Sequence, residues 1–271
     1  EISTNNRFTR VVNVSPTYSI PYTQSFESGS DFWKSGGRNS TWMLRKPHQA
    51  ITNPYIDTAY NGQYCWVTNF EGSHLANDSS YLESPCFDLT ASVAPILEFA
   101  IFTDFQTGVD GANVQYSTDN GLTWDLLPAN AQYNLDWYSS PLVSSLNNPG
   151  WDLENSGWFI VRNLIPDYLL VADAIKFRIV VEADNTVENE GVAIDMVRIY
   201  EAPYDVAVSA LNYPVTDCEI GADVEPVIEL RNDGVSAISA GTVIPVSVYF
   251  NNSFVKTDNI ELSTSLEPGN T

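Results

Sequence analysis

The chain has 271 residues, a length typical of two domains. It contains 34 Asp and Glu residues against 12 Lys and Arg residues, so its formal net charge of −22 excludes nucleic-acid binding as the expected function. Apolar residues make up 44% of the chain and aromatic residues 12%, which predicts a sizeable core and excludes intrinsic disorder. With only 2 His and 3 Cys, the sequence offers little material for transition-metal or Cys/His chemistry.

The N-terminal segment, residues 1–15, is predicted to be a linker or the last strand of a preceding domain. Residues 7–14 have the pattern of a strand, and the segment lacks the basic and apolar regions of a signal peptide. No apolar run is long enough to cross a bilayer, so we expect no membrane insertion. Low Lys content with abundant Asn, Ser, Thr and Tyr is typical of an extracellular protein, and we expect an excerpt from a longer modular chain.

Residues 16–202 are predicted to form one all-β domain. Short apolar or alternating runs recur through this region, and clusters of Asn, Gly, Asp and Pro separate them. The runs are residues 63–69, 80–89, 96–103, 112–117, 158–163, 174–182 and 191–201. Strands at such spacing without intervening helices indicate a β-sandwich or a barrel.

A second domain is predicted over residues 203–271. Every Trp lies before this boundary, and four further strand-like runs follow it at residues 205–213, 224–232, 243–250 and 254–260. The pattern resembles an immunoglobulin-like sandwich, but such domains need roughly 100 residues. We therefore expect this second sandwich to be incomplete at its C-terminus. Cys218 is the single cysteine of this region, with a partner elsewhere or none.

Catalytic chemistry finds little support in the sequence. There is no nucleophile elbow, no H-E-x-x-H and no Gly-rich phosphate loop after a strand. His48 and His74 lie far apart in polar, loop-like segments. Pairs such as Asp104 with Asp110, or Asp184 with Glu188, are expected by chance among so many acidic residues. The protein is predicted not to be an enzyme.

The remaining cysteines allow two interpretations. Cys65 and Cys86 lie on predicted strands of the first domain and could form a disulfide in an oxidising compartment. The apolar residues on both flanks are equally compatible with two buried thiols.

A candidate ligand-binding surface is predicted at Trp42, Arg45 and Lys46. Four of the 12 basic residues fall within residues 34–46, interleaved with Trp33, Trp42 and the nearby His48. Aromatic faces beside cationic donors suit an extracellular glycan or an acidic surface polymer, through stacking and hydrogen bonds. Under the alternative interpretation the Trp residues belong to the core and the basic residues solvate a loop.

Residues 117–124 (STDNGLTW) fit the S-x-D-x-G-x-T-W pattern, which resembles the Asp-box of sialidases. The pattern predicts a hairpin in which Asp119 accepts hydrogen bonds from turn amides, Gly121 takes a positive φ and Trp124 packs beneath the turn. In sialidases the motif repeats on propeller blades remote from the catalytic site. A single copy here indicates a structural hairpin and not a glycosidase.

Four motifs in a fixed order carry a wider resemblance. They are residues 21–29 (PYTQSFESG), 80–89 (SYLESPCFDL), 110–124 (DGANVQYSTDNGLTW) and 191–199 (GVAIDMVRI). This order over residues 16–200 resembles the MAM-like jelly rolls, which include the cleaved-adhesin domains of bacterial surface proteins and the reelin-type repeats. The tail from Asp205 resembles the CARDB-type immunoglobulin-like domains that often follow in large secreted bacterial proteins.

The resemblance implies a structural calcium ion. Carried onto this sequence, its ligands are Glu27 and Asp195, with Asp31 as a further candidate. Carboxylates on two neighbouring strands plus loop carbonyls suit calcium, which accepts several hard oxygen ligands in irregular geometry. Met196 stands where the family usually has a second acidic residue. The alternative is that these carboxylates merely face solvent.

The expected function is therefore non-catalytic: an extracellular adhesion or ligand-binding segment of a large modular cell-surface protein. The alternatives are an accessory carbohydrate-binding module of a secreted peptidase or glycanase, and a spacer domain. Neighbouring domains of the same longer chain are expected partners in each case. Fold resemblance alone does not decide among these classes.

Overall fold

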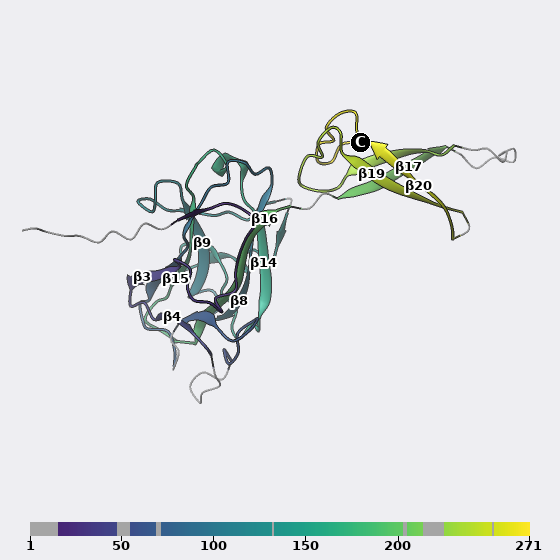
Figure 1. Cartoon of the computed structure of the whole chain (residues 1–271). Helices are drawn as coiled ribbons and strands as arrows, with labels where there is room; N and C mark the ends of the chain where they lie inside the picture. The colour runs from purple at the N-terminus through teal and green to yellow at the C-terminus, as the bar shows by residue number, and fades with distance from the viewer. Residues whose placement is uncertain are drawn as a thin grey trace, which may run out of the picture.

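The computed structural model describes residues 16–47, 55–68, 72–131, 133–202, 205–213, 225–250 and 252–271 (Figure 1). The regular elements of these residues are strands, apart from one short 3-10 helix, η1 (Asp167–Leu169). The all-β prediction is confirmed. In this described part of the chain, no helix has the length and hydropathy needed to span a membrane. The predictions for residues 1–15, His48 and Cys218 lie outside it.

Two antiparallel sheets form the first unit, residues 16–202. The smaller sheet has the strand order β10 (Asp125–Leu126), β9 (Gly111–Ser117), β15 (Lys176–Glu182), β6 (Ser79–Glu83) and β3 (Lys34–Arg38). The larger sheet has the order β11 (Asn134–Leu135), β14 (Phe159–Leu164), β8 (Pro95–Asp104), β16 (Gly191–Glu201), β5 (Cys65–Thr68) and β4 (Trp42–Arg45), and β2 (Tyr22–Gln24) also pairs with β16. The chain alternates between the sheets: β8, β14 and β16 lie in the larger sheet, and β9 and β15 in the smaller one. These crossings build a two-sheet sandwich.

Two minor pairs complete this unit. β1 (Thr17–Tyr18) runs parallel to β7 (Cys86–Phe87), and β12 (Ser140–Val143) pairs with β13 (Asn148–Gly150) in a hairpin. Val143 and Leu146 of the hairpin region pack on Val180 of β15, with Tyr81 against them. The hairpin therefore covers one end of the smaller sheet on the side away from the core.

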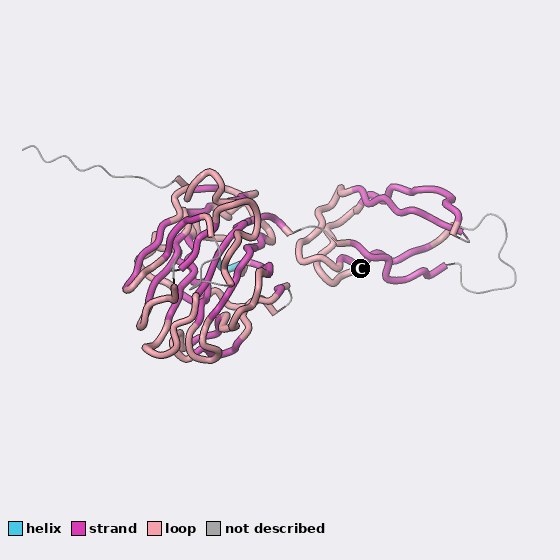
Figure 2. The backbone as a smooth tube through the Cα atoms, turned by 90° about the horizontal axis from the view of Figure 1, so that it is seen from below, coloured by secondary structure: helices cyan, strands magenta, loops and turns pink. Residues whose placement is uncertain are grey.

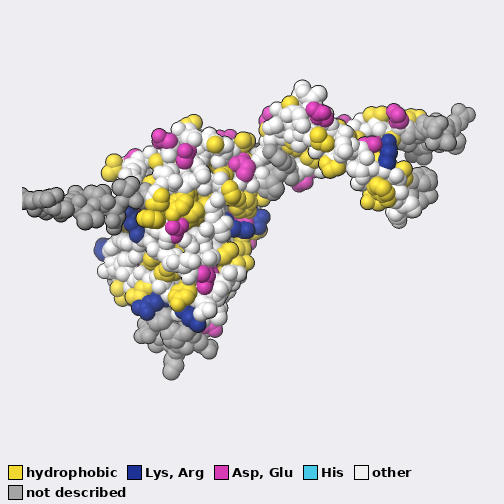
Figure 3. Space-filling view, viewed as in Figure 1, with side chains coloured by type: hydrophobic (Ala, Val, Ile, Leu, Met, Phe, Trp, Pro, Cys, Tyr) yellow, Lys and Arg dark blue, Asp and Glu magenta, His cyan; other side chains and the backbone are white. Residues whose placement is uncertain are grey.

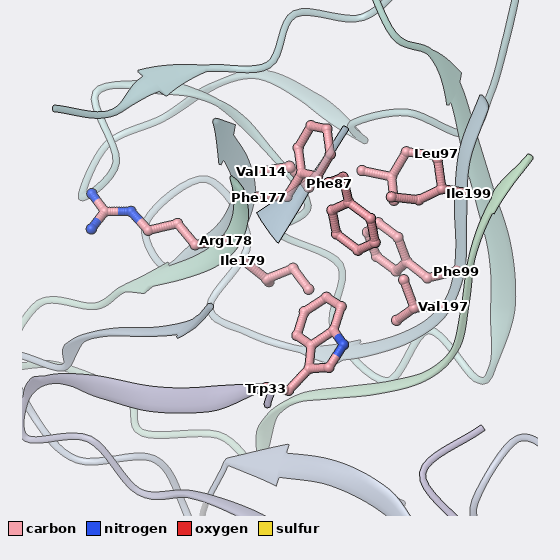
Figure 4. Close-up of a pocket in the computed structure, with 10 residues that line it drawn as sticks. All are labelled: Trp33, Phe87, Leu97, Phe99, Val114, Phe177, Arg178, Ile179, Val197 and Ile199. Carbon is pink, nitrogen blue, oxygen red and sulfur yellow. The ribbon is translucent and has the colours of Figure 1, made fainter. Parts of the chain in front are cut away.

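The core lies between the sheets because their strands alternate. Phe177 and Ile179 of β15 point inward to meet Leu97 and Phe99 of β8, and Figure 4 shows these side chains converging. The space left among them is about 10 Å³, roughly one water molecule, so this interior is filled by side chains. Arg178, between two inward residues of β15, points away from them in the same view.

The larger sheet is also covered on its outer side. Cys65, Val67, Phe102 and Ala193 form a second apolar cluster there with Ile56, which lies in the loop over residues 55–64. This loop covers Phe102 of β8, whereas Ile96 near the other end of the strand packs with Ala94, Leu164 and Ala202. All ten residues of β8 are therefore buried, and not only the alternate ones.

The two cysteines of the first unit are free thiols, so the disulfide interpretation is wrong and the buried-thiol interpretation is confirmed. Cys65 lies on the outer side of the larger sheet, whereas its neighbour Trp66 faces the core. On β7, Phe87 points into the core and the adjacent Cys86 points to the other side of the strand. The Cys86 Sγ lies 3.9 Å from the side-chain oxygen of Asn120. Strand alternation thus turns the two thiols away from each other.

The second unit contains two hairpins, β17 (Val206–Tyr213) with β18 (Val227–Asn232) and β19 (Val243–Phe250) with β20 (Ser253–Glu261). Figure 2 shows them as two arms that meet at the end nearer the first unit. There Ile238 pairs with Leu266, and the buried Asn232 donates hydrogen bonds to the carbonyls of Ser236 and Leu266. Away from this end, apolar side chains are exposed to solvent. Tyr249 and Phe254, for example, are each at least 60% exposed.

Val235 of the second unit packs against a small apolar cluster of the first. The cluster consists of Ala94, Ile96, Leu164 and Ala202 at one end of the larger sheet. That an immunoglobulin-like sandwich begins at residue 203 and is incomplete stays a prediction.

Candidate functional site

The predicted calcium ligands Glu27 and Asp195 approach one loop from two strands. Asp195 lies in β16 at an irregularity in its pairing with β8, and the next residue, Met196, has a φ of 49°. Such a bulge redirects a side chain. The Asp195 side chain is fully buried, and its Oδ2 accepts a hydrogen bond from the Asn61 backbone N–H at 3.0 Å.

Glu27 follows β2 and accepts hydrogen bonds at its Oε1 from the backbone N–H groups of Gln63 and Tyr64, both at 2.8 Å. Gly62 makes this contact possible: its φ is +74°, and a Cβ there would lie 2.5 Å from the Glu27 carboxyl carbon. The glycine therefore leaves a cradle for the carboxylate against the loop backbone.

The two carboxylates also interact electrostatically. Burial, and to a smaller degree the negative charge of Glu27, raise the pKa of Asp195 to about 6. The two carboxylates supply the oxygen ligands that a hard cation prefers. The loop contributes backbone N–H groups to these contacts, which hold the carboxylates in place and are not themselves ligands. Asp31 is engaged elsewhere, since its Oδ1 accepts a hydrogen bond from the Tyr18 hydroxyl at 2.7 Å. Among the residues described, no three His, Cys, Asp or Glu side chains are grouped to hold a metal ion.

The predicted ligand surface at Trp42, Arg45 and Lys46 is not supported for its aromatic member. Trp42 is only 5% exposed and belongs to the main core. Alternation along β4 turns Trp42 inward and Arg45 outward, so the indole face is closed to a ligand. Lys46 is exposed and donates a hydrogen bond to Gln63 Oε1 at 3.0 Å.

Asp104 and Asp110, considered as a chance pair, hold loops together. Asp104 accepts hydrogen bonds from the backbone N–H groups of Asn155 and Glu190, and Asp110 accepts one from that of Asp184. The buried His74 lies with its Nε2 3.8 Å from Asp110 Oδ2. These contacts assign the carboxylates a structural role.

The hairpin over residues 117–124 has the predicted geometry. Asp119 Oδ1 accepts hydrogen bonds from the backbone N–H groups of Leu122 and Thr123, and Gly121 has a φ of +89°. The hydrogen bond from the Thr123 hydroxyl, together with these backbone bonds and that from the Ser117 hydroxyl, lowers the pKa of Asp119 to about 2. The Trp124 ring packs against Gly121, where an added Cβ would meet it at 3.3 Å.

The outer face of the smaller sheet carries a row of planar side chains. The Arg178 guanidinium carbon lies 4.4 Å from the ring centroid of Trp124 and 5.1 Å from that of Tyr81. Both distances are within the range of cation–π contacts. Gln115 on β9 fixes the arginine, because its Oε1 accepts hydrogen bonds from Arg178 Nε at 2.9 Å and Nη2 at 2.6 Å. All three members of the row are partly exposed.

Gly36 of the edge strand β3 extends this row. It pairs with Tyr81, and a Cβ at Gly36 would lie 2.6 Å from the Tyr81 hydroxyl oxygen. The missing side chain thus lets the tyrosine ring lie over the edge strand. We define Trp124, Arg178, Tyr81 and Gly36 as the aromatic row.

A hollow of about 310 Å³ lies at the Tyr81 end of this row. Its polar lining includes Arg38, Ser79, Arg178 and Glu182. Ser79 donates a hydrogen bond to Glu182 Oε1 at 2.8 Å. The hollow therefore offers an aromatic surface together with both hydrogen-bond donors and acceptors.

Sequence reasoning did not find the aromatic row. Strand β15 was expected, and its alternation of Phe177, Ile179 and Val181 with Arg178 and Val180 is the signal for one polar face. The sequence does not show that Trp124 and Tyr81 lie on the same face of the sheet as Arg178. Trp124 was interpreted only as part of a hairpin.

Comparisons with known proteins find likeness only in structure. No protein-family model matches the chain, and no curated protein matches it in sequence. The K1 cleaved adhesin domain of Lys-gingipain from Porphyromonas gingivalis W83 is similar, at 16% identity over 66% of this chain and 97% of that domain, with a TM-score of 0.39. The K2 cleaved adhesin domain of the same protein is 13% identical over 66% of this chain and 98% of that domain, with a TM-score of 0.39. The CBM22-1 xylan-binding domain of Paenibacillus barcinonensis Xyn10C is 11% identical over 66% of this chain and 92% of that domain, with a TM-score of 0.37.

Proposed function

We propose that this chain is a non-catalytic, extracellular glycan-binding segment with an adhesive role, and that it binds glycan on the outer face of its smaller sheet. The observation that supports this is the aromatic row, in which Arg178 lies between the rings of Trp124 and Tyr81. Rings that are already fixed in place lose little conformational freedom when a sugar stacks on them.

The chemistry of the row matches what a sugar presents. A pyranose has apolar C–H faces that stack on an aromatic ring and hydroxyls at its edge that need donors and acceptors. Arg178 uses two of its five N–H donors on Gln115, which leaves others for a ligand. Glu182 and Ser79 at the hollow supply acceptors for hydroxyl groups.

A glycan array that includes xylan fragments tests the proposal. We expect the chain to bind at least one glycan class, and Trp124→Ala to weaken that binding about tenfold or more through the lost stacking surface. The matched control is Tyr55→Ala, which removes a 47% exposed aromatic side chain from the loop on the other sheet. An array without hits, or equal losses in both variants, would refute the proposal.

We also propose that a structural calcium ion binds at Glu27 and Asp195. The support is the convergence of these two carboxylates on the backbone of residues 61–64 and the cradle left by Gly62. When bound, the ion would neutralise the two carboxylates. The protein's own contribution is to hold both side chains at one loop before the ion arrives.

Chelation tests this second proposal. Calcium at about 100 times its Kd would stabilise the folded state by about 2.7 kcal/mol, so a chelator should lower the melting temperature of the first unit. Glu27→Gln should abolish the chelator effect, whereas Asp31→Asn should keep it, because Asp31 bonds to Tyr18 instead. If chelator leaves melting of the unmodified protein unchanged, the calcium proposal fails while glycan binding is unaffected.

A further inference from the structure

The outer face of the smaller sheet differs in charge from the chain as a whole. Strand register places Lys34 and Arg38 of β3 and Lys176 and Arg178 of β15 on it, which is 4 of the chain's 12 basic residues. The carboxylates on the same strand positions are Glu83 and Glu182. In a protein with a net charge of −22, the strand positions of this face thus carry an excess of two positive charges. On the side of the molecule drawn in Figure 3, Lys and Arg side chains lie in small, separate groups.

These cations are not equally available. Glu83 Oε1 binds both Lys34 Nζ at 3.1 Å and Lys176 Nζ at 3.0 Å, so one carboxylate is shared by two lysines. Arg178 is fixed by Gln115, a neutral partner. Arg38 is exposed at the rim of the hollow and forms no ion pair with any residue that the structure describes.

We propose that the hollow binds the carboxylate of a uronic-acid residue in an acidic glycan, with Arg38 as the principal anion-binding residue and Arg178 beside it. This proposal rests on the proposed glycan-binding function and assigns the class of sugar. The planar guanidinium group of Arg38 matches a carboxylate through two parallel N–H···O bonds. The ring carrying that carboxylate would lie over Tyr81, which is partly exposed and lines the hollow.

Glu182 is the group that opposes this ligand. Its carboxylate lines the same hollow, accepts a hydrogen bond from Ser79, and is attracted by the charges of both Arg38 and Arg178. Two arginines against one glutamate leave the hollow with an excess of one positive charge. Glu182 is then positioned to accept a sugar hydroxyl, so the hollow selects for a hydroxylated anion over a simple one.

Three hexasaccharides with one α-1,4-linked galactose backbone separate the alternatives. The first carries the 6-carboxylate (hexagalacturonate), the second the neutral 6-hydroxyl, and the third a 6-sulfate. We expect hexagalacturonate to bind the full chain at least tenfold more tightly than the neutral form in calorimetric titrations. Arg38→Gln should remove that advantage and leave weak binding of the neutral form unchanged.

Arg231→Gln is the matched control, because it removes the same charge from an exposed position on β18 of the second unit. It should change none of the three affinities. Arg45→Gln separately tests the surface predicted from sequence. Melting curves identify any variant that does not fold, and Arg38→Lys then serves in its place, since it keeps the charge but loses the planar donor pair.

Each outcome is decisive. Equal binding of the neutral and carboxylated forms overturns the uronate proposal and leaves glycan binding intact. Equal binding of the sulfated and carboxylated forms shows attraction for any polyanion and also overturns it. Loss of binding in Arg45→Gln but not in Arg38→Gln places the anion at the surface predicted from sequence. Absence of binding by all three, together with an empty glycan array, refutes both proposals.

Discussion

Buried carboxylates in this protein serve mainly as partners for backbone amides. Asp104, Asp195 and Glu190 each accept hydrogen bonds from N–H groups of loops distant in sequence, and the exposed Glu27 does the same. A carboxylate has acceptor sites for several such bonds, and bonds to a charged acceptor are stronger than bonds to a neutral one. The high acidity of the chain is thus partly structural, because acidic residues fix the loops that cover the sheets.

Asp78 is the buried carboxyl group whose titration has the clearest consequence. Burial, with a contribution from the charge of Glu182, raises its pKa to about 7, against about 3.9 in an unfolded chain. The folded state therefore favours the protonated form, and the stability this provides is present at low pH and lost as the pH rises through about 7. We expect the melting temperature to fall from pH 5 to pH 8, and Asp78→Asn to reduce the slope. Identical slopes in both proteins would show that Asp78 does not titrate in this range.

Among the elements, the loop over residues 55–64 depends most on these bonds. It has no regular structure, yet it buries Ile56 against the larger sheet and is held by Glu190, Asp195 and Glu27. Strand patterns predict neither its path nor its partners, because acceptors from residues 27, 190 and 195 meet only in the folded chain.

Substitution of Glu190 tests how much these hydrogen bonds stabilise the loop over residues 55–64. Its two carboxylate oxygens accept the backbone N–H groups of Tyr55 and Ile56 at 3.0 and 2.9 Å. Glu190→Ala leaves both amides without these partners, which should cost about 1–3 kcal/mol of unfolding free energy in denaturant titrations. Glu190→Gln keeps one acceptor oxygen and should lose less. Equal losses would mean that the side chain acts through packing alone.

The predictability of the elements follows the range of their contacts. The hairpin over residues 117–124 was predicted in detail because Asp119 bonds only to neighbours within four residues. The juxtaposition of Glu27 and Asp195 came from a family resemblance, and the structure shows both at one loop. Trp42 was expected at a ligand-binding surface but lies in the core. A cluster of Trp, Arg and Lys has the same composition whether its indole points into the core or toward solvent. The aromatic row joins β3, β6, β15 and the 117–124 hairpin, and no pattern within one segment of the sequence predicts that these elements meet.

At the scale of the whole molecule, the two units differ in how well they are filled. The first has a continuous core between two sheets, whereas β20 in the second is exposed at every position except Ile260. The second unit's described core is small, with Ile238 and Leu266 as its buried apolar side chains. Few buried contacts imply low local stability.

Hydrogen exchange should show this difference directly. We expect amides of β17 to β20 to exchange much faster than those of β8 and β16, whose exchange requires opening of the main core. Val235, which packs on the first unit, should lie at the better-protected end of the second. Equal protection in β8 and β19 would show instead that the second unit is stable as it stands.

Glycan bound on the outer face of the smaller sheet would change the surroundings of Trp124, and indole N–H signals in an NMR titration report this position. The chain has 7 Trp residues, each giving one side-chain signal that a Trp→Phe variant assigns. Hexagalacturonate and a xylo-oligosaccharide would be added in separate titrations. We expect the Trp124 signal to move with ligand concentration while that of the buried Trp42 stays in place. Movement of the Trp42 signal with no change at Trp124 would exclude binding at the aromatic row.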